Sequence, residues 1–484
     1  MVAYESVIGL ECHVELSTDT KMFCGCRNEF GAPPNSNVCP VCLGLPGSLP
    51  VPNEKAIEHI ARIGLALNCR VAADSRFHRK NYFYPDMPKD YQISQYDLPI
   101  CVAGHLDVEV DGSPRRIGIT RVHMEEDTGK TTHVGQTGRI GQAEHALVDY
   151  NRAGVPLVEV VSEPDLRSPE EARAYFAELR ATLEALGVSD VRMEEGSLRC
   201  DANISTRPVG AEALGTKVEI KNLNSIRSLD RALRYEEERQ RAALDAGEPL
   251  RQETRHFDEE QGTTHTLRSK EEAFDYRYFL EPDLPPLAPE PAWVEGVRAS
   301  LPELPAARRE RYVSSLGLKP EQARLLVSSA AAASFFEETV ALGADAKAAA
   351  NWVTQDLAGL LRKARLEPGQ AKVTPNHIGD LVRLIREGTI SATAAKQVLE
   401  EAFETGEDVG AIVERRGLRQ VTDTTALEVW VNEAIAENPG PVEQYRKGKA
   451  PALNAVLGQV IKKSGGSANP KVVRELLLER LSGS

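Results

Sequence analysis

Two short segments of the chain carry acidic and histidine residues at spacings that suit a metal ion. The first reads Glu11-Cys12-His13-Val14-Glu15. Alternate side chains of a β-strand point to opposite faces, so Glu11, His13 and Glu15 would share one face of a strand here. Two carboxylates beside an imidazole suit a hard divalent cation such as magnesium. The alternative is a solvated face of an edge strand.

The second acidic segment, residues 123–127, reads His-Met-Glu-Glu-Asp and ends a β-rich run. Its three consecutive carboxylates repel one another unless cations or basic side chains gather them. Beside the first segment, they would complete a magnesium site able to hold nucleotide phosphates. There the carboxylates of Glu125, Glu126 and Asp127 would lie beside Glu11 and His13. A solvated acidic turn is the alternative.

Between these segments, residues 78–96 combine five aromatic side chains with three Lys or Arg residues and several amides. Aromatic rings can stack on nucleic-acid bases, and basic side chains can bind phosphates. The alternative is a buried aromatic strand whose Lys and Arg side chains extend to the surface.

Four cysteines fall within nineteen positions of a Pro/Gly/Asn-rich region, at Cys24, Cys26, Cys39 and Cys42. Four thiolates can surround a tetrahedral zinc ion and leave no ligand position for a substrate. In a long chain without a secretory signal, metal ligands or reduced thiols are favoured over disulfides. The sequence therefore predicts a structural zinc.

Two later segments also place polar residues alternately along predicted strands. Asp201 and Asn203 share a face of one strand. Lys217, Glu219 and Lys221 share a face of the next. A sheet lined in this way predicts a polar cleft, to which Glu15 of the first segment is also assigned, although an exposed sheet face gives the same pattern.

The elements that must position these residues are mixed strands and helices up to about residue 280, which indicates an α+β fold. A helix is predicted from Pro169, with Ser168 as its cap and Gly187 at its end. The predicted strands are 6–16, 106–110, 116–122, 157–161 and 217–220.

Seven prolines between residues 281 and 305 mark a domain boundary, and we expect no regular structure there. Beyond it the apolar residues recur at helical spacing. The helical stripes lie within 378–385, 427–435 and 453–461, and a last helix follows Pro470.

Length and charge narrow the class of protein. A chain of 484 residues exceeds what one hydrophobic core usually serves. The net charge of −14 argues against a protein that coats nucleic acid indiscriminately. Residues 445–484 nevertheless hold eight Lys or Arg against two Asp or Glu, so this tail has either an anionic partner or a solvated helix face. With no membrane-spanning run and no secretory signal, a cytoplasmic location is expected.

Together, these segments make the chain resemble the B subunit of the glutamyl/aspartyl-tRNA amidotransferase family almost end to end. The matching stretches are 7–15, 79–86, 91–96, 123–130, 149–157, 193–205, 219–225 and 275–286.

The resemblance implies three domains. A β-rich cradle similar to the glutamine synthetase catalytic fold would occupy residues 1–292, a helical connector 293–408, and a helical, tRNA-contacting tail 409–484.

The rival class is a non-catalytic, zinc-containing tRNA-binding scaffold, which would have no need for two converging acidic segments.

The family resemblance further implies a carbon–nitrogen ligase that uses ATP and Mg²⁺ to phosphorylate the side-chain carboxylate of Glu-tRNA(Gln) or Asp-tRNA(Asn). Ammonia would come from glutamine through an amidase (A) subunit, with a small C subunit completing a heterotrimer. On the matching positions, Glu11, His13, Glu125 and Glu126 correspond to metal and phosphorylation residues. Lys80 and Lys89 correspond to the mouth of an ammonia tunnel.

Overall fold

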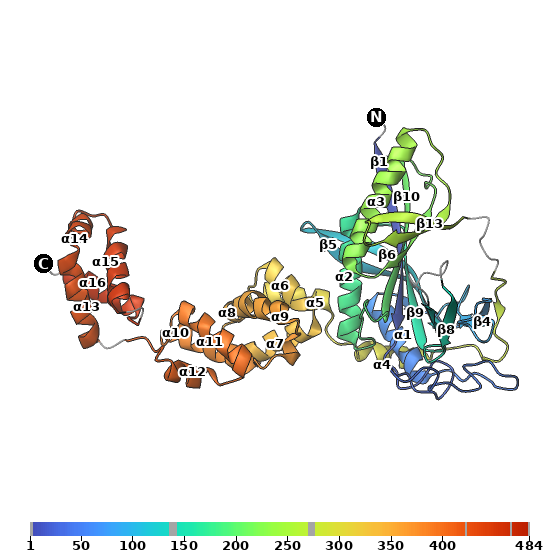
Figure 1. Ribbon diagram of the computed structural model, residues 1–484, viewed down its shortest axis with the longest axis horizontal. Coiled ribbons are helices and arrows are strands. Elements are labelled where there is room, and N and C mark those ends of the chain that lie inside the picture. Colours follow the sequence, from blue (N-terminus) through green and yellow to red (C-terminus); the bar gives the residue numbers. More distant parts are fainter. Residues whose placement is uncertain (1–2, 135–142, 270–275, 422–423, 465–466, 483–484) are drawn as a thin grey trace. The chain divides into compact units, whose positions relative to one another are not determined.

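The computed structural model describes residues 3–134, 143–269, 276–421, 424–464 and 467–482. It divides into two compact units, Met1–Pro305 and Ala306–Ser484. The first unit mixes sheets and helices, and the described part of the second consists of helices and their connections (Figure 1). The predicted α+β class is therefore confirmed. Asp275, in the last stretch of family resemblance, lies outside the described residues.

A large sheet forms the centre of the first unit. In the described residues its strands are β1 (Tyr4–Glu15), β2 (Arg70–Val71), β5 (Cys101–Val110), β6 (Ser113–Glu126), β9 (Pro156–Ser162), β10 (Leu198–Pro208), β11 (Val218–Leu223), β12 (Glu253–Asp258) and β13 (Thr263–Ser269). They follow the spatial order β13-β12-β11-β10-β1-β9-β6-β5-β2. All five strands expected from the sequence are present. β1 lies between β10 and β9, and β9 separates it from β6.

Two smaller sheets accompany the large one in the described part of this unit. The first contains β3 (His78–Asn81), β4 (Tyr91–Ser94) and β14 (Phe279–Leu280), and the second pairs β7 (Lys130–Val134) with β8 (His145–Asp149). β3 and β4 carry Arg79, Lys80 and Tyr91 of the aromatic and basic segment noted in the sequence, and its other four aromatic residues lie outside these two strands.

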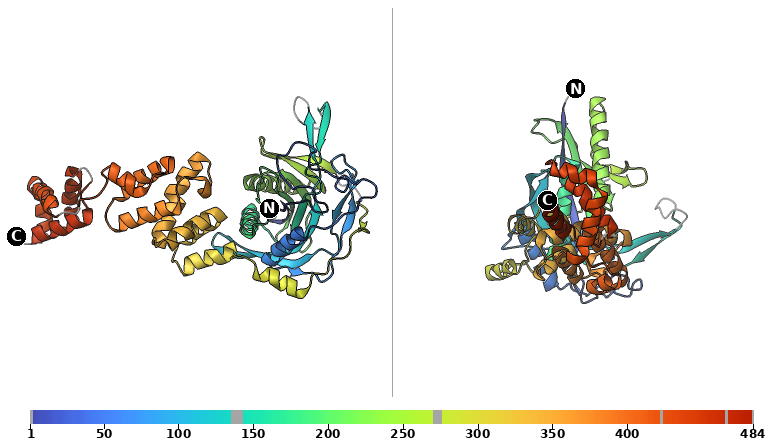
Figure 2. Two further views of the ribbon diagram at one scale, coloured as in Figure 1. Left: turned by 90° about the horizontal axis from the view of Figure 1, so that it is seen from below. Right: turned by 90° about the vertical axis from the view of Figure 1, so that its left-hand side faces the viewer.

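Helices cover one face of the large sheet. They are α1 (Glu54–Ala66), α2 (Pro169–Leu186) and α3 (Ile226–Asp245), and α2 and α3 lie side by side along the sheet (Figures 1 and 2). Ile60, Phe176 and Leu233 from these helices join Leu10 and Cys12 of β1 in one buried core. Each such fully buried apolar side chain contributes about 1.5–3 kcal/mol. Because the core takes the even-numbered side chains of β1, the odd-numbered ones lie on the opposite face.

Helix α2 begins and ends where the sequence predicts. The Ser168 hydroxyl accepts a hydrogen bond from the Glu171 amide, and Pro169 occupies the first turn. Gly187 ends the helix with a φ of 65°, a left-handed conformation that glycine adopts without steric cost.

The expectation of no regular structure in the proline-rich segment was wrong. Helix α4 (Pro291–Ala299) forms there, with Pro291 in its first turn. Proline is tolerated at that position because the amide it lacks would have no helical partner, and no other proline occurs up to residue 301. Val297 packs with Ala61 and Leu65 of α1, so α4 belongs to the first unit.

The second unit contains two hydrophobic clusters in its described residues, one within 312–413 and the other within 427–481. Val409 and Ile412 join the earlier cluster. The division at 292/293 and 408/409 stays a prediction. The helices are α5 (Pro305–Ser314), α6 (Pro320–Val327), α7 (Ala330–Ala341), α8 (Ala346–Asn351), η3 (Trp352–Leu357), α9 (Ala358–Ala364), η4 (Pro368–Gln370), α10 (Pro375–Arg386), α11 (Ala392–Thr405), α12 (Val409–Arg415), α13 (Thr424–Glu437), α14 (Pro439–Arg446), α15 (Ala452–Lys463) and α16 (Pro470–Ser482).

Among the described residues of the whole chain, no helix has the length and apolar character needed to cross a membrane.

Candidate active site

Strand β1 separates a buried apolar face from a polar one. Cys12 and Val14 are fully buried against the helices. Glu11, His13 and Glu15 alternate with them and are half-buried on the opposite face of the sheet. The strand therefore presents three ionisable groups on the face that α1, α2 and α3 leave uncovered.

An acid–histidine cluster, consisting of His13, His123, Glu125 and Glu159, forms on this face. Glu159 on β9 is the register partner of both His13 on β1 and His123 on β6. Its Oε2 atom lies 3.1 Å from His123 Nε2 and 3.9 Å from His13 Nε2. Glu125, two residues beyond His123 on β6, has its Oε1 atom 3.6 Å from His123 Nε2.

Burial and charge act in opposite directions on this cluster. Burial disfavours the charged form of His123, but hydrogen bonds to Glu125 and Glu159 outweigh it and raise the pKa of His123 to about 9. Burial would likewise raise the carboxylate pKa values. Lys80 and His123 outweigh it at Glu125, and His123 does so at Glu159, so both pKa values are lowered. At neutral pH the cluster thus holds two carboxylates and an imidazolium.

The β3–β4 sheet holds Glu125 from the other side. The Ser94 hydroxyl donates to Glu125 Oε1 over 3.0 Å, and Gln92 Nε2 donates to Oε2 over 3.2 Å. Lys80 Nζ lies 3.9 Å from Glu125 Oε1. Burial opposes the charge of Lys80, yet Glu125 raises its pKa. A persistent positive charge therefore stands beside the cluster.

The donor set of the cluster suits a divalent cation. One ligand atom each from His13, Glu125 and Glu159 lies within 4.8 Å of the others. Two ligands of one magnesium ion are at most about 4.2 Å apart, since each bond is about 2.1 Å long. A small inward shift of these side chains would bring them to that geometry.

The other two predicted magnesium ligands lie outside the acid–histidine cluster. Glu126 follows Glu125 directly on the strand and turns elsewhere, where it accepts the Ile93 amide over 2.8 Å and pairs with Lys89. Glu11 accepts a hydrogen bond from Asn203 Nδ2 over 2.9 Å. Burial and the charge of Glu159 raise the pKa of Glu11. The four-residue magnesium set stays a prediction, of which the structure brings His13 and Glu125 together.

Glu15 belongs to a separate ion network at the end of β1. Arg152 Nε lies 3.3 Å from Glu15 Oε1. Asp127 Oδ2 lies 2.8 Å from both Arg152 Nη2 and Arg199 Nη2. Burial would raise the pKa of Asp127, but the two guanidinium groups outweigh it and lower that pKa. The network ties β6 to β10 and to the loop before β9.

The predicted polar cleft residues lie on neighbouring strands of the same sheet. Lys221 Nζ is 2.6 Å from Asp201 Oδ2 and 3.1 Å from Glu219 Oε1. Glu219 also accepts a hydrogen bond from the Thr254 hydroxyl over 2.7 Å. Lys221 therefore compensates one of the two negative charges.

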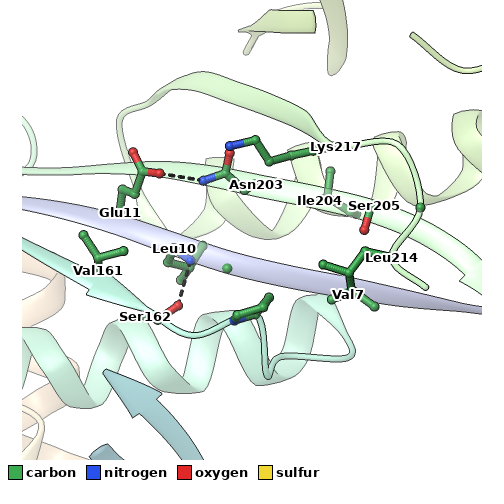
Figure 3. A pocket seen from close by; sticks show the side chains of 13 residues that line it. Val7, Leu10, Glu11, Val161, Ser162, Asn203, Ile204, Ser205, Leu214 and Lys217 are labelled. Atoms are coloured by element: carbon green, nitrogen blue, oxygen red, sulfur yellow. Dashed lines mark hydrogen bonds between the residues drawn. The ribbon is translucent and has the colours of Figure 1, made fainter. Parts of the chain in front are cut away.

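A pocket of about 190 Å³ extends along β1 from Glu11. Figure 3 shows Glu11, Asn203 and Lys217 along one side of it, with Val7 and Leu214 at the other end. The Asn203 Oδ1 atom is buried and has no hydrogen-bond partner in the described part of the chain. An unsatisfied buried acceptor indicates a place for a ligand donor or a water molecule.

The four predicted zinc ligands converge. The Sγ atoms of Cys24, Cys26, Cys39 and Cys42 lie within 4.8 Å of one another, with 3.9 Å between those of Cys39 and Cys42. A tetrahedral zinc with bonds of about 2.3 Å separates its sulfur ligands by about 3.8 Å. The chemistry and spacing of these thiols fit that ion.

The sequence patterns did not identify Glu159 and indicated no role for His123. One signal was available, because Glu159 is the single charged residue of strand β9. A charged group in a buried strand needs a partner. His13 and His123 become its partners through the register in which β9 pairs with β1 and β6. That register cannot be read from the sequence of β9.

Comparisons with known proteins give a consistent result over nearly the whole chain. The family model described as the GatB/GatE catalytic domain matches residues 6–295, and the one described as the GatB domain matches residues 334–481. A protein of Moorella thermoacetica, named as the B subunit of an aspartyl/glutamyl-tRNA(Asn/Gln) amidotransferase, is 56% identical over 99% of this chain and 100% of its own length. Proteins of the same name from Carboxydothermus hydrogenoformans and Frankia casuarinae are 52% and 54% identical, over 100% of this chain and 100% and 97% of their own lengths.

Proposed function

Because the chain belongs to the family of B subunits of the aspartyl/glutamyl-tRNA(Asn/Gln) amidotransferases, we propose that it activates the side-chain carboxylate of Glu-tRNA(Gln) or Asp-tRNA(Asn) with ATP. The substrate carboxylate attacks the γ-phosphorus of ATP and releases ADP. Ammonia then attacks the acyl phosphate, inorganic phosphate leaves, and the amide forms. Phosphorylation is needed because a carboxylate oxygen is itself a poor leaving group.

The acid–histidine cluster is the observation that carries this proposal. We assign the magnesium ligands to His13, Glu125 and Glu159, and magnesium bound there would neutralise phosphate charge. Lys80, beside Glu125, would attract the negatively charged substrate. A protein that only binds tRNA has no use for buried carboxylates held in this way, so the cluster disfavours the scaffold alternative.

The pocket beside Glu11 is our candidate site for the nucleotide. It lies on the same face as the acid–histidine cluster, and the exposed ammonium of Lys217 lines it. The unsatisfied Oδ1 atom of Asn203 would accept a hydrogen bond from the nucleotide.

We therefore expect Lys217→Ala to raise the KM for ATP about 10- to 100-fold, the value of one charge-assisted hydrogen bond. The KM for aminoacyl-tRNA should stay within about twofold. Steady-state phosphate release at varied ATP checks this, and an unchanged KM for ATP would move the nucleotide elsewhere.

The ammonia comes from a partner. We propose that the amidase (A) subunit releases it from glutamine and that a small C subunit completes the heterotrimer. Lys80 and Lys89 are our candidates for the tunnel mouth. Lys89 and Glu126 form an almost fully buried ion pair. This pair would therefore line the inside of the tunnel mouth and not the protein surface. The helical tail at residues 409–484, whose basic part is residues 445–484, would contact tRNA. This role in protein biosynthesis supports a cytoplasmic location.

We propose a structural zinc at the four clustered cysteines. The purified protein should contain about one zinc per chain, and Cys39→Ser should lose it and lower the melting temperature of the first unit. Cys69→Ala is the matched control, because Cys69 is a buried thiol outside the cluster. Elemental analysis together with a thermal melt checks both points, and full retention of zinc by Cys39→Ser would exclude this site.

The activation step can be tested without the ammonia supply. The heterotrimer is incubated with ATP, Glu-tRNA and hydroxylamine but no glutamine. An acyl phosphate would react with hydroxylamine to give a hydroxamate on the tRNA-bound side chain. Hydroxamate that needs ATP supports the kinase role, whereas its absence alongside normal tRNA binding would favour the scaffold.

A further inference from the structure

A stack of tyrosine rings lies close to the acid–histidine cluster and has no part in the chemistry proposed above. The rings of Tyr96 and Tyr278 are stacked, with 4.5 Å between their centroids and 14° between their planes. Tyr276 meets Tyr278 edge to face at 6.3 Å, and His78 meets Tyr96 in the same way at 6.2 Å. We call Tyr96 and Tyr278 the tyrosine stack.

Two short paths connect the tyrosine stack to Glu125. Lys80 Nζ lies 5.2 Å from the centre of the Tyr276 ring and 3.9 Å from Glu125 Oε1. On the other side, Tyr96 follows two residues after Ser94, whose hydroxyl binds Glu125. Two residues of extended chain span about 7 Å. The backbone of Tyr96 thus lies at most about 7 Å from that of Ser94, and Tyr276 lies beside Lys80, so the tyrosine stack is near the cluster.

Part of the tyrosine stack is open to solvent. Tyr96 is 54% exposed although Tyr278 covers one face of its ring. More than half of this residue is thus available for contact. The exposed part of the Tyr96 ring is therefore open to stacking by a further aromatic ring.

We propose that the tyrosine stack binds the terminal base of the aminoacyl-tRNA by extending its rings with one more aromatic layer. This inference rests on the proposed function and names the part of the substrate held there. The reacting carboxylate is joined to the terminal ribose only by a short side chain and one ester bond. The terminal base must therefore lie just outside the reaction centre.

The chemistry of the acceptor end fits such a surface. The last nucleotides of tRNA are single-stranded, so both faces of the terminal base are free to stack. Stacking on an aromatic side chain needs no particular hydrogen-bond pattern. Lys80, between the tyrosines and Glu125, supplies the positive charge that a side-chain carboxylate needs at the inner end.

The test compares three variants of the reconstituted heterotrimer. Tyr96→Leu removes the exposed ring, and we expect it to raise the KM for Glu-tRNA about 5- to 100-fold. Tyr96→Phe keeps the ring and should stay within about twofold of wild type. Phe279→Leu is the matched control. Phe279 follows Tyr278 in the chain and also has an exposed ring, but this ring lies against the guanidinium group of Arg79 and not in the tyrosine stack.

A direct readout uses tRNA with 2-aminopurine as its terminal base. Stacking should quench its fluorescence on binding to wild type and Tyr96→Phe, and the quenching should be lost in Tyr96→Leu. Equal quenching and an unchanged KM in Tyr96→Leu would overturn the proposal. So would weaker heterotrimer assembly with normal quenching, which would assign the rings to a partner protein.

This experiment distinguishes an error in the proposed function from an error in the role of the tyrosine stack. If wild type releases no phosphate in response to Glu-tRNA, the proposed function is wrong and the tyrosine stack loses its substrate. If wild type is active and only the Tyr96→Leu effects are missing, the tyrosine stack alone is wrong.

Discussion

Glu125→Gln should lower Glu-tRNA-dependent phosphate release by about 100- to 1000-fold, the usual loss when one preorganised electrostatic group is removed from a reaction centre. Glutamine keeps the size of the side chain but removes the charge that faces Lys80 and His123. It also removes one of the two carboxylates that we assign to magnesium, with Glu159 as the other. The loss should appear in kcat, because the charge acts on the phosphate during transfer.

The measurement is phosphate release by the heterotrimer at saturating ATP and Glu-tRNA, with tRNA affinity determined separately. Glu170→Gln is the matched control, because Glu170 is also a paired carboxylate but lies on α2 and pairs with Arg234. It should behave as wild type. If Glu125→Gln retains its rate while Glu126→Gln loses it, the metal site lies on the Lys89 side and our assignment is wrong.

Asp127→Ala should destabilise the first unit by about 2–3 kcal/mol, less than the usual cost of breaking a fully buried ion pair, because both arginine partners are partly exposed. The Asp127 carboxylate is 3% exposed and accepts from both Arg152 and Arg199. Its removal leaves the partly exposed guanidinium groups of Arg152 and Arg199 without their shared counter-charge. Hydrogen exchange of the β6 and β9 amides, which reports the opening of this unit, measures the loss.

Asp107→Ala is a closely matched control. Asp107 is likewise paired with an arginine, Arg116. Arg116 Nε donates to Asp107 Oδ1 over 2.8 Å, and Arg116 Nη2 donates to Asp107 Oδ2 over 2.8 Å. Both side chains are more than half exposed, so water screens the pair. We expect a loss below about 1 kcal/mol. Equal losses in the two variants would mean that burial does not set the strength of these pairs.

Much of the fold could be predicted from local patterns. Alternation of polar and apolar residues identified β1, and the Ser168, Pro169 and Gly187 signals fixed both ends of α2. The proline-rich segment misled us because the number of prolines matters less than their positions. A proline in the first turn leaves the rest of α4 free to form.

The sequence by itself determined which residues of β1 share a face, because the period of a strand is two whatever it pairs with. It also determined the four clustered cysteines, whose spacing is local, and the family resemblance that the comparisons bear out. Tertiary structure alone decided which charged groups meet. Glu159 faces His13 and His123 because β9 pairs with β1 and β6 in one register, and a slip of one residue would turn it into the apolar core. That register depends on the packing of α1, α2 and α3 against the opposite face, which no spacing along the chain specifies.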